Sequence, residues 1–329
     1  MVPPSSLLNP VFDLTTLSFI FVFLLFSLFS LVFIFYFRLK TRNSDHLREF
    51  SSLWTIRTLL VSFITLWALT ETLRLPVLFF RRYPFIFSFF SPLTLIQQSN
   101  LCKIHVVLSL GLFEPGFFAT LLFLVNVSVR KRNPTDTFAT AFSIVSACCI
   151  PILVFQVLFV FFPTTFNHFG LPESLSRSFV LVSDGTGGNI ALCTYPLFSS
   201  ISFGAFGIVY VLSFLLSCWR LISLVINKGL RLRIYTLALA VLLTLPIQIV
   251  FLVISVLWNP DDTVFQGLAL LVFLCMLSCA VVGVGILVIR PIFDALAVAS
   301  IEASWCSRRN GHDLLPPSAD VAEKPGVLG

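Results

Sequence analysis

Charge is what this sequence has least of. Only 11% of its 329 residues are Asp, Glu, Lys or Arg, whereas 57% are hydrophobic. A water-soluble domain usually carries about 25% charged residues, which solvate its surface. The composition therefore excludes a soluble globular fold.

The motifs of common enzymes are also missing. The four histidines lie on different connections or faces, and no pair of them has the spacing of a metal site (His46, His105, His168 and His312). There is no Gly-x-Ser-x-Gly elbow, and no Lys-Ser/Thr comes after the glycine-rich run Asp184–Asn189 as it would in a phosphate loop. We expect a non-enzyme without metal or cofactor, and we interpret the glycine-rich run as a flexible turn.

Seven long apolar stretches are what the sequence does contain. They are Leu14–Phe37, Trp54–Leu73, Leu101–Val129, Thr137–Phe162, Pro196–Ile226, Ile234–Trp258 and Phe265–Ile289. Each is near or above the roughly 20 residues that cross about 30 Å of hydrocarbon as a helix. A helix satisfies its own backbone hydrogen bonds in lipid. The sequence therefore predicts an all-α polytopic membrane protein, a seven-transmembrane-helix bundle in contact with the lipid bilayer.

Residues 14–290 form this transmembrane domain, and residues 1–13 form a short amino-terminal segment before it. In residues 291–306 the apolar side chains fall near one side at helical spacing, which predicts a short amphipathic helix on the inner membrane surface. Residues 307–329 are polar and contain prolines, so we expect a disordered cytoplasmic tail.

The basic residues predict the orientation. Of the 21 Lys and Arg residues, 15 fall on one set of alternate connections and five on the other. The richer side is cytoplasmic by the positive-inside rule, which places the amino terminus outside. The net charge of +6 then reflects topology, and we expect no nucleic-acid partner. The basic inner connections are a candidate surface for a cytosolic protein, and we favour the plasma membrane over an endomembrane.

Two of the eight cysteines would face the outer compartment, Cys102 and Cys193. A disulfide persists in an oxidising compartment, so these two are the natural pair. The alternative is two unrelated small apolar residues. Cys306, at the end of the predicted surface helix, is a candidate palmitoylation site, with an unmodified thiol as the alternative.

Glu114 is the main candidate for a functional residue. It lies about a dozen residues below Cys102, or roughly 18 Å at the rise of an α-helix, which is close to mid-bilayer. Ionisable groups at this depth are costly and suggest function. We predict that Glu114 faces the bundle interior and contributes to a ligand site with Trp67 and Gln248. The alternative is a protonated glutamate that is hydrogen-bonded to Gln156 or Gln248.

Arg57 and Glu71 are the charged residues of the second stretch. Arg57 lies near the inner boundary, from which its side chain can reach water. Glu71 lies near the outer boundary and is expected to pair with Arg74 three residues on. Both are interpreted as anchoring residues.

The whole arrangement resembles the architecture of G-protein-coupled receptors. The shared features are seven helices, an outside amino terminus, Cys102 placed to meet Cys193, a proline in helix six (Pro246) and a surface helix after helix seven. The third stretch ends Val127-Ser128-Val129-Arg130 and lacks an acidic-Arg-Tyr triplet, and helix seven has no Asn-Pro-x-x-Tyr. Coupling to a G protein is therefore not implied.

A second likeness covers most of the chain. It rests on the runs Leu53-Trp54-Thr55-Ile56-Arg57, Leu66-Trp67-Ala68-Leu69, Leu73-Arg74-Leu75-Pro76, Leu110-Gly111-Leu112-Phe113-Glu114-Pro115 and Leu192-Cys193-Thr194-Tyr195-Pro196-Leu197. These runs resemble plant seven-transmembrane proteins of undefined function, some of them candidate receptors. The resemblance implies a plant membrane protein and gives it no ligand, substrate or activity.

The predicted function is receptor-like signalling, with a small-molecule ligand entering from the outer face. One alternative is a non-catalytic membrane scaffold that recruits cytosolic partners. The other is a proton-coupled transporter, for which Glu114-Pro115 at mid-depth is the relevant feature. A ligand-sized outer cavity with Glu114 at its floor would favour the receptor, whereas a tightly packed interior would favour the scaffold.

Overall fold

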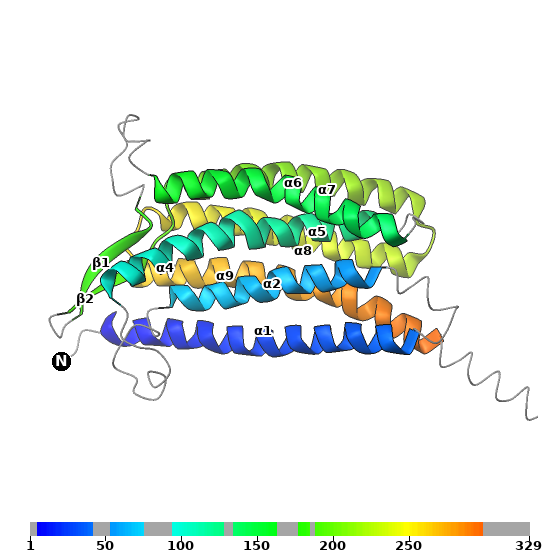
Figure 1. Ribbon diagram of the computed structural model, residues 1–329, viewed down its shortest axis with the longest axis horizontal. Coiled ribbons are helices and arrows are strands. Elements are labelled where there is room, and N and C mark those ends of the chain that lie inside the picture. The colour runs from blue at the N-terminus through cyan, green and yellow to red at the C-terminus, as the bar shows by residue number, and fades with distance from the viewer. Residues whose placement is uncertain are drawn as a thin grey trace, which may run out of the picture.

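The protein is a bundle of long helices that lie side by side (Figure 1). The computed structural model describes residues 5–41, 53–75, 94–127, 134–162, 177–184 and 188–298. Within these ranges, seven helices are long and apolar enough to cross a membrane. The prediction of an all-α seven-helix bundle is confirmed.

Five spans are single helices. They are α1 (Ser5–Thr41), α2 (Trp54–Arg74), α6 (Pro134–Phe161), α7 (Leu197–Leu224) and α8 (Lys228–Ser255). The third span consists of α4 (Leu95–Leu108), the π-helical turn η4 (Ser109–Phe113) and α5 (Glu114–Val127). The seventh begins with α9 (Thr263–Val284) and the π-helical turn η7 (Gly285–Ile289), and it continues as helix to Val298.

Both π-helical turns come just before a proline. Glu114-Pro115 comes after η4, and Arg290-Pro291 comes after η7. A proline has no N–H, and its ring collides with the carbonyl four residues earlier in a regular α-helix. In a π turn the hydrogen bonds span five residues, which widens the helix at that point. We infer that these turns let both spans continue through their prolines.

The surface helix predicted over residues 291–306 is described in its first half. Residues 290–298 are helical and follow η7 without a break in the helix. A helix over this part of the segment agrees with the prediction, and its place on the membrane surface stays a prediction. Residues 299–306, including Cys306, and the predicted tail 307–329 lie outside the described residues.

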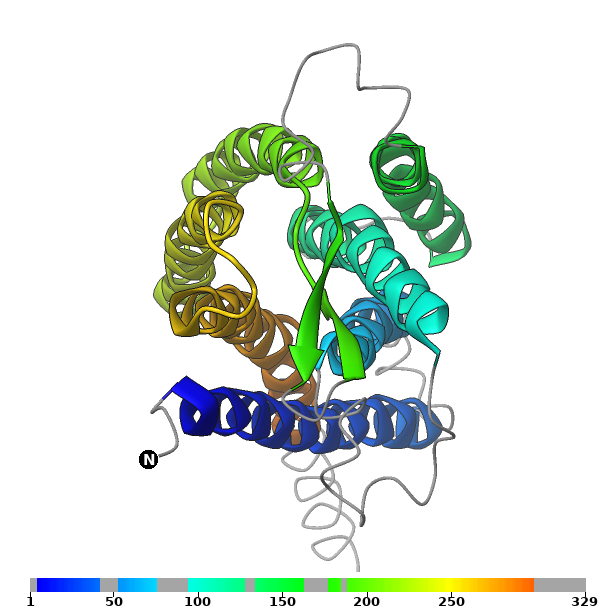
Figure 2. The ribbon, with the colours of Figure 1, turned by 90° about the vertical axis from the view of Figure 1, so that its left-hand side faces the viewer.

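An antiparallel hairpin lies among the helices in the described part of the chain. Strand β1 (Phe179–Asp184) pairs with β2 (Gly188–Cys193), with Phe179 opposite Cys193 and Asp184 opposite Gly188. The glycine-rich run Asp184–Asn189, which was predicted as a turn, contains the last residue of β1 and the first two residues of β2, and its residues 185–187 lie outside the described residues. The strands themselves were not predicted. The hairpin lies across one end of the bundle, which Figure 2 shows facing the viewer.

The two ends of the bundle differ. The chain enters α1 at the hairpin end, and its last described residues leave at the opposite end (Figure 1). Basic side chains have partners at that opposite end. The Arg38 guanidinium lies 3.5 Å from the centre of the Trp54 ring, in a cation–π contact. Arg233 forms an ion pair of 2.6 Å with Asp294. We call the hairpin end the outer end and the opposite end the inner end, as the charge pattern predicts.

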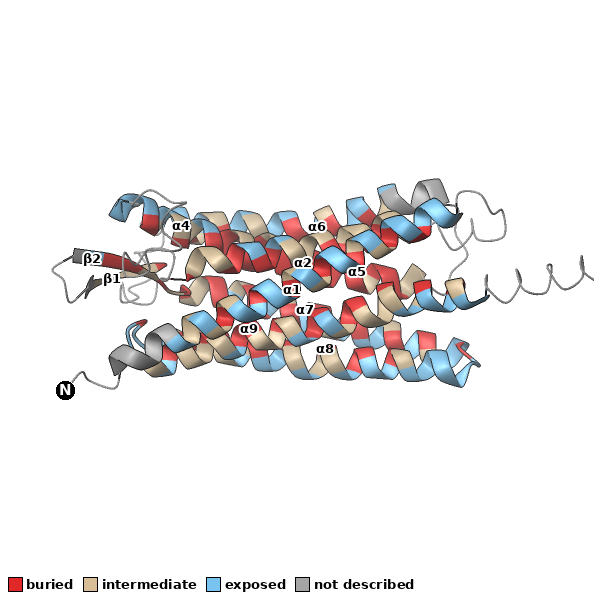
Figure 3. Ribbon diagram, turned by 90° about the horizontal axis from the view of Figure 1, so that it is seen from below, coloured by how far each residue is buried: buried red, intermediate tan, exposed pale blue. Residues whose placement is uncertain are grey.

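The third span runs through the middle of the bundle. Buried residues are concentrated along it (Figure 3). In an apolar stretch of 18 residues within this span, 83% of the residues are buried. The corresponding share is at most 50% in the other spans. A side chain on this span therefore meets protein in nearly every direction, which decides the surroundings of Glu114.

Candidate functional site

Glu114 lies at the centre of a buried hydrogen-bond cluster. The Trp67 indole nitrogen donates to Oε1 of Glu114 over 3.1 Å, and the Ser109 hydroxyl donates to the same atom over 2.9 Å. The Gln248 amide nitrogen donates to Oε2 over 2.7 Å. Glu114 is 2% exposed. One carboxyl group thus joins α2, the third span and α8, and we call these four residues the Glu114 cluster.

The π turn is what brings Ser109 to Glu114. Residues five apart in an α-helix point about 140° away from each other, since each residue turns by about 100°. In η4 the backbone N–H of Glu114 bonds to the carbonyl of Ser109, so the two residues lie one above the other. π turns inside helices are frequent at functional sites.

Trp67 extends the cluster to a fourth helix. Its ring stacks on Phe273 of α9, with 5.4 Å between ring centres and 12° between planes. The three residues predicted to form a ligand site, Glu114, Trp67 and Gln248, therefore do come together in the interior. Gln156, the other partner considered for Glu114, donates instead to the backbone carbonyl of Ser199 over 3.0 Å.

The geometry of the cluster suits either protonation state of Glu114. The three donors suit an ionised carboxylate, which only accepts hydrogen bonds. The buried Oε1 of Gln248 has no partner among the described residues. If the Gln248 amide turned over, this oxygen would lie where it could accept the proton of a neutral Glu114. A proton could thus be gained or lost with one side-chain rotation.

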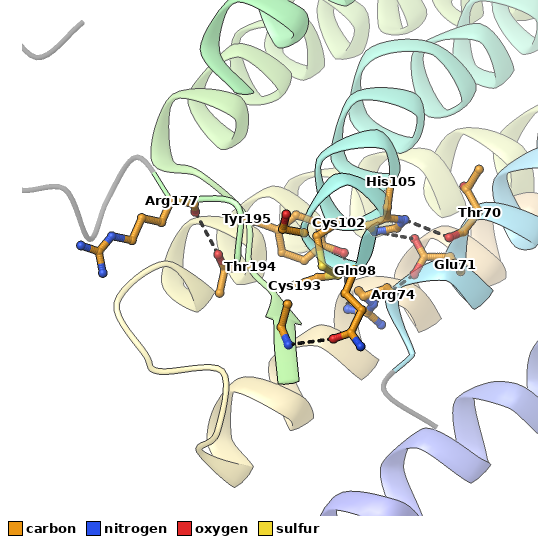
Figure 4. The surroundings of a disulfide bond; sticks show 12 residues. Thr70, Glu71, Arg74, Gln98, Cys102, His105, Arg177, Cys193, Thr194 and Tyr195 are labelled. Atoms are coloured by element: carbon orange, nitrogen blue, oxygen red, sulfur yellow. Dashed lines mark hydrogen bonds and ion pairs between the residues drawn. A yellow bond between two sulfur atoms is a disulfide. The ribbon is translucent and has the colours of Figure 1, made fainter. Parts of the chain in front are cut away.

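A second polar layer lies toward the outer end. Glu71 approaches Nε of Arg74 at 3.4 Å, which confirms the predicted pair. Nε2 of His105 lies 3.9 Å from Glu71, too far for a hydrogen bond. Nδ1 of His105 lies 3.0 Å from the carbonyl oxygen of Thr70, which marks Nδ1 as the protonated nitrogen (Figure 4). His105 was not recognised from the sequence as part of a site.

Tyr195, in the connection between β2 and α7, is the fourth residue of this layer. Its hydroxyl lies 3.4 Å from a terminal nitrogen of Arg74, which donates to it. Burial raises the pKa of Tyr195, so its hydroxyl stays protonated at physiological pH. We call Glu71, Arg74, His105 and Tyr195 the outer layer.

A disulfide holds the hairpin over the third span. Cys102 of α4 is bonded to Cys193 of β2, and their Cα atoms are 5.1 Å apart. The predicted pairing is confirmed. The backbone N–H of Ala191 also donates to the Gln98 side chain over 3.1 Å. These two links tie β2 to α4, and Tyr195 lies two residues after the bonded cysteine (Figure 4).

A small cavity lies at the outer end beside this layer. It has a volume of about 40 Å³ and lies between α1, the end of α2, β2 and α9. Its polar lining residues are Asp13, Thr16, Arg74 and Gln266. Sites for drug-sized ligands are usually about 300–1,000 Å³. This cavity is much smaller and is not lined by Glu114, so it is not the ligand-sized cavity with Glu114 at its floor that the receptor hypothesis anticipated.

Arg57 occupies the first turn of α2, near the inner end. It is only 8% exposed, and its buried Nε has no hydrogen-bond partner among the described residues. The structure encloses most of this side chain, and the expectation that its end reaches water stays a prediction.

Seven membrane-crossing helices around an enclosed polar interior define an integral membrane protein. The chain belongs to the family described as "Uncharacterised conserved protein UCP031277", whose model matches residues 2–305. That description names no activity. No curated protein matches the chain.

Proposed function

We propose that this protein is a non-catalytic, receptor-like membrane protein that relays an event at its outer end to its inner end. The observation that carries the proposal is the Glu114 cluster. Glu114 holds α2 and α8 against the third span through hydrogen bonds of 2.7–3.1 Å, and the Trp67–Phe273 stack adds α9. A change in one carboxyl group would therefore act on four helices at once.

The outer layer is in position to act on the Glu114 cluster. Glu71 lies four residues after Trp67 on α2, and His105 lies four residues before Ser109 on the third span. Residues four apart are neighbours on one helix face. A ligand that displaced Arg74 or Glu71 would thus push on the two helix faces that hold Glu114.

Charge adds a second route between the two layers. Glu71 and Glu114 are both buried carboxyl groups, so each one would experience the charge of the other. Like charges in a medium of low dielectric constant repel strongly. Any rearrangement that uncovers or neutralises Glu71 would therefore change the balance between ionised and neutral Glu114.

A scaffold is the second candidate function. Both oxygens of Glu114 already have donors, and Glu114 does not line the outer cavity. A carboxyl group packed in this way would hold helices together without switching. The basic inner connections would then recruit a cytosolic partner. A proton-coupled transporter would also use Glu114, through a change in its protonation. The resemblance to plant proteins stays a prediction.

Distances at the inner end distinguish the receptor from the scaffold. Spin labels are placed at the exposed residues Leu39 of α1 and Leu232 of α8, in full-length protein in lipid nanodiscs with Cys148 and Cys306 changed to serine. The distance distribution is compared between the parent and Glu114→Gln. A matched control is Thr120→Val, because the hydroxyl of buried Thr120 donates to the carbonyl of Gly116 in its own helix and has no other hydrogen bond within the described residues.

The receptor proposal expects Glu114→Gln to shift the Leu39–Leu232 distribution and Thr120→Val to leave it unchanged. Identical distributions for the parent and Glu114→Gln would refute the relay and favour the scaffold. A shift in both variants would mean that the label pair reports general loosening, and the relay would again lack support.

A further inference from the structure

We propose that the outer cavity binds a small ligand that carries a primary ammonium group. The cavity and its charge are independent of the Glu114 cluster, but the assignment of this ligand as the signal rests on the proposed function. The argument starts from Asp13, near the start of α1, which lines the cavity and is partly buried.

Asp13 is a carboxylate without a direct polar contact in the described part of the chain. It forms no hydrogen bond or ion pair there, and Arg74 acts on it electrostatically from across the cavity. Arg74 lines the same cavity, but its guanidinium already contacts Glu71 and Tyr195, each at 3.4 Å. Among the described residues, two carboxylates therefore share one guanidinium, which leaves this part of the site with an excess of negative charge. Burial of an uncompensated charge is costly, so the site favours a cation.

The remaining polar groups are acceptors that fit an ammonium ion. Oε1 of Gln266 is buried and has no hydrogen-bond partner among the described residues. Thr16 lies three residues after Asp13 on α1, and its hydroxyl donates to the carbonyl of Phe12 over 2.9 Å, which leaves its oxygen able to accept. An ammonium group has three donors. Asp13, Thr16 and Gln266 thus supply three acceptors from two helices.

The aromatic lining and the small volume of the cavity determine which ammonium ions fit. Phe12 and Phe265 lie among the lining residues, and aromatic rings attract cations. A water molecule needs roughly 10–15 Å³ of cavity volume. The cavity of about 40 Å³ therefore accommodates a few non-hydrogen atoms, such as methylammonium or ethylammonium. Tetramethylammonium has no N–H donor and is bulkier.

The test uses the full-length protein in nanodiscs and measures its apparent Tm by tryptophan fluorescence. Ethylammonium chloride is titrated against sodium chloride at equal ionic strength, with sodium acetate and tetramethylammonium chloride as comparison salts. We expect a saturable rise in Tm with ethylammonium only, because a ligand that binds the folded state stabilises it. Asp13→Asn removes the charge at constant size and should raise the apparent Kd by roughly tenfold or more.

The matched control is Asp261→Asn, since Asp261 is an exposed carboxylate just before α9 and is not among the lining residues. It should bind ethylammonium like the parent, and Gln266→Leu should bind it more weakly. Three results would overturn the proposal: a response to acetate in place of ethylammonium, an equal response in Asp13→Asn, or no response to any salt, which would mean a cavity filled by water alone.

The spin-label experiment separates this site from the relay. If ethylammonium binds in an Asp13-dependent way and the Leu39–Leu232 distances are the same in the parent and in Glu114→Gln, the ammonium site stands and the relay fails. If distances respond to Glu114→Gln but no amine binds, the relay stands and the ammonium site fails.

Discussion

Trp67 and Glu114 are 47 residues apart in the chain, and their side chains are joined by a hydrogen bond of 3.1 Å in the middle of the bundle. Both residues are at most 2% exposed. A buried donor that loses its acceptor costs the full desolvation of that donor. The bond therefore makes the identity of residue 114 a question of stability as well as of function.

Glu114→Leu should destabilise the protein more than Glu114→Gln. Leucine leaves the donors of Trp67, Ser109 and Gln248 without an acceptor, at about 1–3 kcal/mol for each unsatisfied group. Glutamine keeps one oxygen that can accept from Trp67 and Ser109. The measurement is the apparent Tm of each variant in the same nanodiscs. Equal losses for the two variants would contradict the hydrogen-bonded cluster.

Breaking Cys102–Cys193 should destabilise the outer end. The bond joins residues 91 positions apart, and removal of a disulfide of that span costs about 2–5 kcal/mol. We expect a lower Tm for the double variant Cys102→Ser/Cys193→Ser. Cys148→Ser is the control, because Cys148 is a free and exposed cysteine. Peptide mapping without reductant should recover the two cysteines in one linked fragment; finding them as separate thiols would be inconsistent with the structure.

Gly116→Ala should be harmful although the change is small. A Cβ atom at residue 116 would lie 2.6 Å from the Phe63 ring, so α2 and α5 would have to separate or the ring would have to turn. Overpacking of this kind costs about 1–3 kcal/mol. Adding Phe63→Leu should recover part of the loss. Gly267→Ala is the matched control, since nothing lies within 4 Å of its Cβ position, and it should be neutral or stabilise by up to about 1 kcal/mol.

The two termini should be on opposite sides of the membrane. An odd number of spans carries the chain from the outer end at α1 to the inner end at Val298 (Figure 1). Epitope tags placed before Met1 and after Gly329 are read by antibody access in intact and permeabilised cells. Only the amino-terminal tag should be accessible in intact cells, and accessibility of both would mean that one span is miscounted.

The spans were predictable because hydropathy is a local property. An apolar run such as Phe265–Ile289 is visible in the sequence itself. Cys102 and Cys193 were distinguished from the membrane-buried cysteines in the same way, by their positions relative to the apolar runs. The predicted start of the third span at Leu101 is late, because Thr94 and Gln97 form a capping box that begins the helix at Leu95. That signal is present in the sequence, and hydropathy alone does not detect it.

The surroundings of the polar residues were harder to predict, because they depend on which helices become neighbours. The depth of Glu114 was sufficient to predict an interior position near Gln248. Nothing local to His105 indicates its bond to the Thr70 carbonyl, and nothing local to Asp13 brings it beside Gln266. The cavity at Asp13 arises where α1, α2, β2 and α9 meet, and no single segment contains it.

The π turn η4 also changes how the third span must be read as a periodic pattern. It holds one residue more than a regular turn, so every side chain after Phe113 is out of phase with those before Ser109 by about 100°. A helical wheel drawn through Leu95–Val127 as one helix would place Cys102 and Glu114 at false relative angles. Deletion of one residue from η4 would restore the regular phase, and it would turn either the disulfide or the carboxyl group away from its partner.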